Sequence, residues 1–219
     1  MIFHKDRFRF RRFVPIAALA LTLTLSACQG SGASTETSPD GKAPLADALP
    51  ALAVKYVSYD EGSGPISTEA QAERDIAEVN RLWSPCGVRF RLSRYLSVNP
   101  SSYGLSSGAG AANETSAIRN AFSEPDSLLV VYTGNWNTVK NAWTAMPGSA
   151  PYGAVLESSV VNYPNIVAHE LGHYLGLDHV STSSNIMSTL IYPSSTSLSA
   201  AQCQTAQRTI AQYWSAMLK

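Results

Sequence analysis

Three of the four histidines in this 219-residue sequence lie close together, at His169, His173 and His179. His169 and His173 are four residues apart, so on a helix both side chains lie on one face, one turn apart. Gly176 lets such a helix end and the chain turn back, which brings His179 toward the other two. Three imidazoles can bind one zinc ion and leave a fourth position for water. Glu170 adjoins the first histidine and can act as a general base, so the pattern predicts metal-assisted hydrolysis.

A helix must position these residues. Pro164 stands where a helix can begin, because proline is favoured in the first helical turn. Val167, Leu171 and Leu175 follow at intervals of four and predict a stripe that faces the core. The two histidines lie on another face, so the sequence predicts a helix that is buried on one side and carries metal ligands on the other.

Residues 169–179 read HELGHYLGLDH and contain HExxHxxGxxH, a pattern that resembles the metzincin clan of zinc endopeptidases. Met187, in the segment NIMS at 185–188, resembles the methionine of the clan's Met-turn, which lies beneath the zinc. Within the clan, the chain is most similar to the matrixin-type proteases, particularly their compact bacterial relatives. The resemblance implies protein or peptide substrates, Glu170 as general base, Met187 as a structural support, and one catalytic Zn²⁺ held by His169, His173 and His179.

The chain also departs from the matrixin pattern. Val180 follows the third histidine, where matrixins usually have serine, and Tyr192 and Pro193 come later and in reversed order relative to the residues that follow a matrixin Met-turn. No tyrosine lies two residues after Met187, so the tyrosine zinc ligand of astacins is not implied. Structural calcium is common in matrixins, but no acidic loop requires it here. The zinc site is thus intact, while the subfamily and its specificity pocket stay open.

The rest of the globular part predicts an α/β fold. Alternating or continuous apolar residues predict strands at 52–57, 88–92 and 127–133. Apolar residues at helical spacing predict helices at 68–83 and from Ser199 onward, and each helix begins with residues that fit a capping box, Thr68 with Gln71 and Ser199 with Gln202. The resemblance implies an α/β (α+β) metzincin-like fold: a twisted, mostly parallel sheet with a long helix, a zinc-binding helix, a Met-turn and a C-terminal helix.

The segment at 152–156 precedes the zinc helix and has two interpretations. In the resembled fold an edge strand pairs with an extended peptide, which would place Gly153, Ala154 and Val155 in the substrate groove. The alternative is a plain structural strand. Tyr192, after the Met-turn, is expected to line the pocket beyond the scissile bond.

The N-terminus predicts export. A basic segment precedes a twelve-residue apolar stretch at 14–25, which is too short for an ordinary membrane span. The stretch ends in LSAC at 25–28, which resembles the lipobox of bacterial lipoproteins, where the cysteine is acylated. We therefore expect a lipoprotein signal peptide at 1–27 and a lipid anchor at Cys28. An ordinary secretory signal cut near Ala27 is the alternative.

Small polar residues at 28–50 predict a flexible tether, with a short pro-segment as the alternative, ahead of a catalytic domain at 51–219. The mature chain is thus expected to be lipid-anchored in the cell envelope, at the outer membrane in a Gram-negative cell, or secreted. Without residues 1–27 it carries eleven Lys and Arg and fifteen Asp and Glu, a net charge of −4. This charge argues against a nucleic-acid partner, and we expect a monomer.

Two cysteines remain besides the one in the lipobox. Cys86 follows the first long helix, and Cys203 lies on the apolar stripe of the last helix. An even pair in an exported protein predicts one disulfide, which closes a loop of over a hundred residues. Two buried free thiols are the alternative.

Three functions are compatible with this pattern. The first is a zinc endopeptidase tethered to the bacterial cell envelope. The second is a peptide- or surface-binding module that keeps the zinc fold but has little turnover, and the third is a zinc enzyme that acts on a non-peptide bond. The intact Glu170 favours the first over the second, and the resemblance to the clan disfavours the third.

Overall fold

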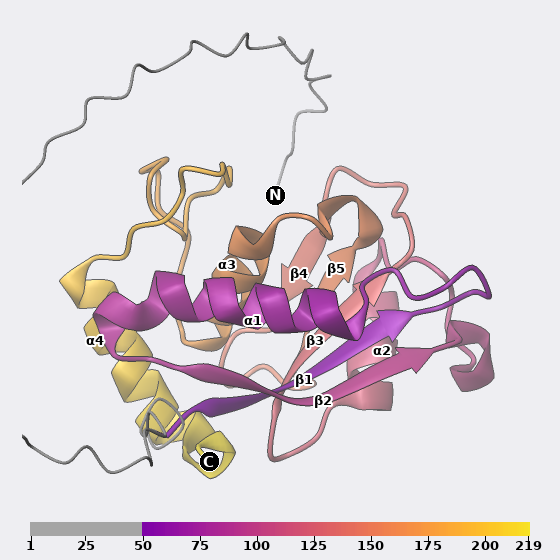
Figure 1. Cartoon of the computed structure of the whole chain (residues 1–219), viewed down its shortest axis with the longest axis horizontal. Helices are drawn as coiled ribbons and strands as arrows, with labels where there is room; N and C mark the ends of the chain where they lie inside the picture. Colours follow the sequence, from indigo (N-terminus) through magenta and orange to yellow (C-terminus); the bar gives the residue numbers. More distant parts are fainter. Residues whose placement is uncertain (1–49) are drawn as a thin grey trace, which may run out of the picture. The chain divides into compact units, whose positions relative to one another are not determined.

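A five-stranded sheet organises residues 50–219, the part of the chain that the structure, a computed structural model, describes (Figure 1). The strands are β1 (Leu52–Tyr59), β2 (Phe90–Val98), β3 (Leu128–Thr133), β4 (Ala142–Thr144) and β5 (Ala154–Glu157). They lie in the order β2-β1-β3-β5-β4, and all neighbours are parallel except β4, which is antiparallel to β5. The predicted α/β fold with a mostly parallel sheet is confirmed.

Helices cover both faces of this sheet. The α-helices of the described residues are α1 (Glu69–Trp83), α2 (Ala112–Phe122), α3 (Pro164–Tyr174) and α4 (Ala200–Thr209). Shorter helical segments are Ser84–Cys86, Pro100–Tyr103, Ser158–Val160, Ile210–Trp214 and Ser215–Met217. One hydrophobic cluster joins the sheet to α1, α3 and α4, and a second joins its other face to α2. Figure 1 shows α1 crossing the front face of the sheet and α2 behind the sheet.

The central strands are buried on both sides. All eight residues of β1 and all six of β3 are buried, because each strand has a neighbour on either edge and helices over both faces. In β1, Val54 and Tyr56 pack in the cluster with α1 and α3, whereas Val57 and Tyr59 pack in the cluster with α2. The interior strand predicted at 127–133 is therefore confirmed, and its continuous apolar run follows from burial on both faces.

Capping side chains fix the starts of α1 and α4. Thr68 Oγ1 accepts a hydrogen bond from Gln71 N at 3.2 Å, as the sequence predicts. The Gln71 side chain, however, donates to the buried Asp75 at 2.7 Å. The reciprocal capping box forms at α4, where Gln202 N donates to Ser199 Oγ and Ser199 N donates to Gln202 Oε1. Both helices thus begin where their polar residues predict.

Of the two interpretations of the segment at 152–156, the edge strand is wrong and the plain structural strand is confirmed. β5 lies between β3 and β4, so a neighbouring strand occupies each of its edges. Ala154 and Val155 are buried in this interior strand, where they cannot pair with a substrate, and Gly153 is buried just before it. The edge of the sheet on this side is instead β4, a strand of three residues that the sequence analysis missed.

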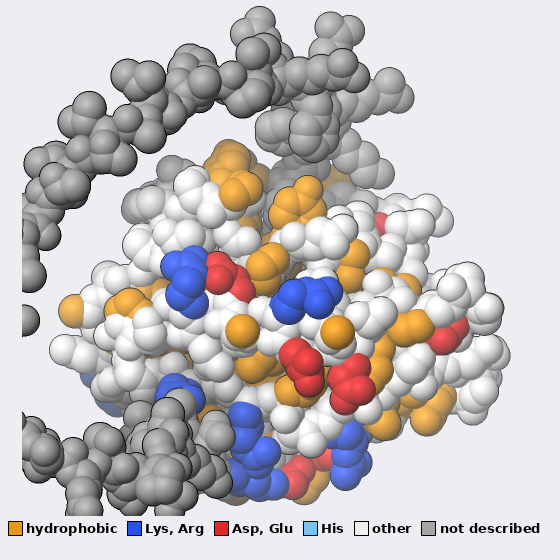
Figure 2. Space-filling model, in the orientation of Figure 1, with side chains coloured by type: hydrophobic (Ala, Val, Ile, Leu, Met, Phe, Trp, Pro, Cys, Tyr) orange, Lys and Arg blue, Asp and Glu red, His pale blue; other side chains and the backbone are white. Residues whose placement is uncertain are grey.

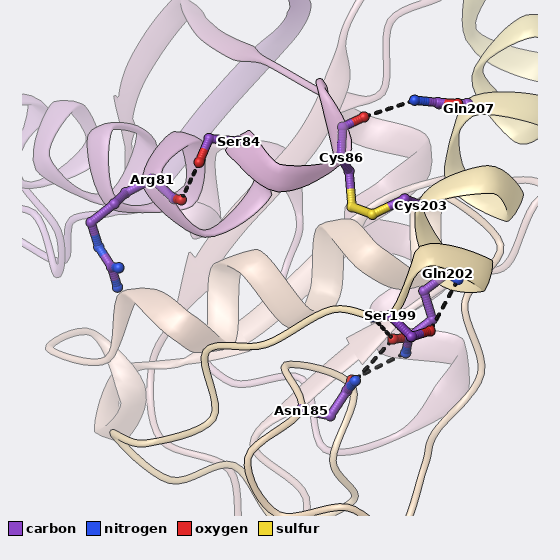
Figure 3. The surroundings of a disulfide bond; sticks show 8 residues. All are labelled: Arg81, Ser84, Cys86, Asn185, Ser199, Gln202, Cys203 and Gln207. Atoms are coloured by element: carbon purple, nitrogen blue, oxygen red, sulfur yellow. Dashed lines mark hydrogen bonds between the residues drawn. A yellow bond between two sulfur atoms is a disulfide. The ribbon is translucent and has the colours of Figure 1, made fainter.

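A disulfide joins the end of the first long helix to the last one, as predicted. Cys86 and Cys203 are bonded, with their Cα atoms 4.8 Å apart (Figure 3). Gln207, one turn along α4 from Cys203, donates a hydrogen bond from Nε2 to Cys86 O at 2.8 Å. The alternative of two free thiols is therefore excluded.

The features predicted at the N-terminus lie outside the described residues. These are the signal peptide at 1–27, the lipid-bearing Cys28 and the tether, of which only Pro50 is described. None of the helices in the described part has the length and hydrophobicity that a membrane crossing requires.

On the face shown in Figure 2, Lys and Arg side chains lie among Asp and Glu side chains.

Candidate metal centre

The helix α3 carries two of the three histidines. It begins at Pro164 and ends at Tyr174, close to the bounds that the sequence predicts. The chain then reverses through Gly176, whose φ of +77° strains any residue with a side chain. A Cβ at Gly176 would also collide with Thr209 of α4. This turn allows His179 to reach back toward the helix.

The structure brings the three predicted ligands together. The Nε2 atoms of His169 and His173 are 3.0 Å apart, and each lies 3.2 Å from Nε2 of His179. Three nitrogens that bind one tetrahedral zinc at its usual distances lie roughly 3.3 Å from one another. Among residues 50–219, these histidines are the only cluster of three or more His, Cys, Asp or Glu side chains with such geometry. The spacing fits one Zn²⁺.

Backbone carbonyls set the tautomers of the two helical histidines. Nδ1 of His169 donates to Ile186 O at 2.7 Å, and Nδ1 of His173 donates to Leu177 O at 2.8 Å. Because a carbonyl oxygen can only accept, each Nδ1 carries the proton and each Nε2 keeps a free lone pair. Burial lowers the pKa of His169 to about 3 and also lowers the pKa of His173 and His179. Neutral imidazole is the form that binds zinc.

Glu170 lies buried beside this cluster, with 2% of its surface exposed. Its Oε2 accepts a hydrogen bond from Thr144 Oγ1 at 2.6 Å. Burial raises the pKa of Glu170 to about 7, while the hydrogen bond from Thr144 and the positive charge of Arg119 act in the opposite direction. A carboxylate with a pKa near neutrality suits a general base.

Met187 lies beneath the zinc helix. It is fully buried, and a Cβ built on Gly172 would collide with its Sδ atom, so the helix packs directly on the methionine. Its backbone N donates to Asn185 Oδ1 at 2.9 Å, and its carbonyl accepts from Val180 N at 2.9 Å. This position is consistent with the support that the sequence predicts for Met187.

Comparison with known proteins finds a family that this site resembles. The model of the matrixin family matches residues 101–209, which include the zinc helix, the third histidine and the Met-turn. Over these residues, just under half of the sequence, the chain is similar to the matrixins. Matrixins are zinc metalloendopeptidases, and they use such a histidine cluster to bind catalytic zinc.

The fold agrees with this similarity. One similar solved structure is metalloproteinase-II from Bacteroides fragilis, with a TM-score of 0.51 and 18% sequence identity. The match covers 72% of this chain and 53% of that chain, so this sequence spans about half the length of the solved structure. No curated protein matches the chain.

An amide pair holds the Met-turn of this chain (Figure 3). Asn185 Nδ2 donates to Gln202 Oε1 at 2.9 Å, and Gln202 Nε2 donates to Asn185 Oδ1 at 3.1 Å. Because Gln202 also caps α4, the start of that helix is tied to the turn that carries Met187 and the Ile186 carbonyl. Sequence reasoning identified Gln202 only as a capping residue.

A buried arginine holds the edge strand. Arg119 of α2 donates from Nε to Gly153 O at 2.8 Å and from Nη2 to Trp143 O at 2.7 Å. A Cβ at Gly153 would collide with the Arg119 side chain, so this glycine makes room for the arginine. No sequence pattern indicates this contact, since an arginine on a short helix is usually solvated.

Tyr192 lies at the surface after the Met-turn, with 45% of its area exposed. Its carbonyl accepts a hydrogen bond from Asn165 Nδ2 at 2.9 Å, and its N donates to Ser195 Oγ at 3.0 Å. The loop after the Met-turn is thus tied to the first turn of α3, and the substrate role of Tyr192 stays a prediction.

Proposed function

We propose that this protein is a matrixin-type, zinc-dependent endopeptidase that acts in the bacterial cell envelope. The observation that carries the proposal is the convergence of three Nε2 lone pairs beside a buried carboxylate. His169, His173 and His179 would hold the zinc. The bound ion would act as a Lewis acid that polarises the scissile carbonyl and lowers the pKa of water.

The chain's own residues supply the proton transfer. Glu170 is the general base: it accepts a proton from the attacking water and then donates that proton to the nitrogen of the leaving amine. Its burial excludes bulk water from the carboxylate, which supports a role in the reaction rather than in binding alone. The two histidines of α3 stay oriented throughout, because the Ile186 and Leu177 carbonyls hold their Nδ1 atoms.

The free edge of β4 is the proposed site for the substrate backbone. Glu157 N donates to Asn141 O, so this pair of the antiparallel ladder is hydrogen-bonded. Such pairs alternate, and the next hydrogen-bonded pair includes Trp143. The backbone N–H and C=O groups of Ala142 and Thr144 therefore face away from β5. An extended peptide can add there as a further strand, with Tyr192 lining a pocket beyond the scissile bond.

We also propose that Cys28 carries the lipid that anchors the enzyme. The support is the sequence LSAC at 25–28, which follows a basic and apolar leader. The polar segment that follows would act as a tether between the anchor and the catalytic domain.

A quenched peptide library tests the catalytic proposal. Protein loaded with one zinc per chain is expected to cleave internal peptide bonds, to lose activity when a chelator removes the zinc, and to regain activity when zinc is restored. Retention of zinc and tight binding of peptides without cleavage would instead identify a binding module. Hydrolysis of non-peptide substrates alone would also overturn the proposal.

A further inference from the structure

The edge strand contributes a side chain to the catalytic glutamate. Thr144 is the last residue of β4, and its Oγ1 lies 2.6 Å from Glu170 Oε2. A hydroxyl that donates to a carboxylate at this distance forms a charge-assisted hydrogen bond. Among the described residues, no other side chain donates a hydrogen bond to Glu170.

This contact leaves the two carboxylate oxygens in different situations. Oε2 accepts the hydrogen bond from the Thr144 hydroxyl, whereas Oε1 has no side-chain donor among the described residues. The torsions that end a glutamate side chain are soft, and a buried carboxylate without a donor would have no fixed rotation. The hydrogen bond therefore selects one orientation of the base.

The donor itself is held firmly. Arg119, a buried residue of α2, binds Trp143 O on β4 and Gly153 O before β5, which fixes the edge strand to its neighbour before any peptide binds. Threonine is branched at Cβ, which restricts its χ1 rotation on a strand. The hydroxyl is thus presented to Glu170 from a rigid position.

We propose that Thr144 is a positioning residue that orients Glu170 for proton transfer and links the base to the strand along which the substrate lies. The inference rests on the proposed endopeptidase function. It follows from two properties of one residue: the backbone groups of Thr144 face the free edge of the sheet, and its side chain holds the carboxylate. Loss of the hydroxyl should therefore slow the reaction without weakening the binding of zinc or of the peptide.

The test compares Thr144→Val with Thr144→Ser. Valine keeps the shape and the strand preference of threonine but removes the donor, whereas serine keeps the donor. We expect Thr144→Val to lower kcat about tenfold or more, since small misplacements of catalytic groups cost up to about 10²-fold. KM and zinc content should stay at wild-type values, and Thr144→Ser should recover most of the lost kcat.

Thr138→Val is the matched control, because it removes a threonine hydroxyl from the exposed segment just before β4, where that hydroxyl contacts only Lys140. It is expected to leave kcat and KM unchanged. If Thr144→Val does not fold, Thr144→Ala replaces it in the same comparison, with the melting curve as the check on folding.

The outcomes separate this inference from the proposed function. Wild-type protein that binds zinc but cleaves no peptide contradicts the endopeptidase function itself. The wild-type protein could instead be active while Thr144→Val leaves kcat unchanged or changes KM alone. Either result shows that Thr144 has only a structural role in β4 and overturns the inference. Failure of Thr144→Ser to recover kcat also overturns it.

Discussion

Each helical histidine is oriented by a carbonyl oxygen that lies beyond the end of α3. His173 uses Leu177 in the turn after the helix, and His169 uses Ile186 in the Met-turn. Because these partners fix the ring orientation and the tautomer of His169 and His173, both helical ligands direct an Nε2 lone pair toward the position of the metal.

Glu170→Gln and His173→Ala are expected to separate chemistry from metal binding. Glutamine keeps the size of glutamate but cannot accept a proton, so zinc should stay near one per chain while peptide hydrolysis falls at least about 10²–10⁴-fold. His173→Ala removes a ligand and should lose zinc and activity together. Elemental analysis and cleavage of a quenched peptide measure the two effects. Near-wild-type turnover by zinc-loaded Glu170→Gln would show that the assigned base is wrong.

The zinc affinity of the Glu170→Gln variant is expected to fall less than 30-fold between pH 7 and pH 6. Three histidines with the ordinary pKa of about 6.5 would lose affinity about 30-fold over this range, because each becomes protonated as the pH falls. Here burial lowers the pKa of all three, so protonation competes with zinc less than it would for free imidazoles. Competition with a chelator at the two pH values measures the change, and a loss of 30-fold or more contradicts the expectation.

At the scale of elements, the parts of the fold with a local signature could be predicted and the pairing of strands could not. Pro164 and an apolar stripe indicate the helix at 164–174, and a continuous apolar run indicates the strand at 128–133. β4 has only three residues, too few to show a period, and its place at the edge depends on contacts far along the chain. The prediction therefore assigned the substrate edge to the more apolar β5.

The same limit applies to the site. The ligands and Glu170 could be predicted because they share one short segment with fixed spacing. The Thr144–Glu170 contact spans 26 residues, and the Asn185–Gln202 pair spans 17. Contacts of this kind depend on how whole elements pack, so no local pattern indicates them. The supporting residues of the site are visible only in the folded chain.

Gln202→Ala is expected to weaken zinc retention through the Met-turn. The change removes both amide hydrogen bonds to Asn185, whose neighbour Ile186 orients His169. Partners that orient metal ligands typically contribute 10- to 100-fold in affinity, so we expect a loss of about tenfold. Zinc competition on folded protein measures it.

Gln207→Ala is the matched control for this prediction. Gln207 lies on the same helix and donates to Cys86 O, away from the Met-turn. It should leave zinc affinity unchanged. If the two variants retain zinc equally well at equal stability, the amide pair has no influence on the metal centre.

At the scale of the whole molecule, Cys28→Ser is expected to abolish anchoring. A single acyl chain binds membranes only marginally, whereas two or more anchor a protein stably, as the lipobox predicts for this chain. The variant should therefore stay unprocessed or be released as soluble protein. Detergent phase partitioning of wild type and variant measures the difference, and equal partitioning into water would leave an ordinary secretory signal as the explanation.

Removal of the disulfide is expected to lower the free energy of unfolding by about 5 kcal/mol in the chain-entropy model, because the bridge closes a long loop. Cys86 and Cys203 are separated by 117 residues along the chain. Denaturant unfolding of the Cys86→Ser/Cys203→Ser protein, compared with wild type in the same zinc-loaded form, measures the loss. Two thiols that can be alkylated in native exported protein would contradict the bridge itself.

On the proposed export route, the position of this bridge sets the order in which the protein can mature. It joins the short helical segment Ser84–Cys86, which follows α1, to the helix whose first turn holds the Met-turn through Gln202 and Asn185 (Figure 3). Thiols stay reduced in the cytoplasm and pair in oxidising compartments. A newly made chain on this route would therefore lack the covalent support behind its zinc site until it has crossed the cytoplasmic membrane. The reduced protein in the cytoplasm would then be less stable than the oxidised protein outside it. The proposed protease would therefore be least stable in the compartment that holds the cell's own cytoplasmic proteins.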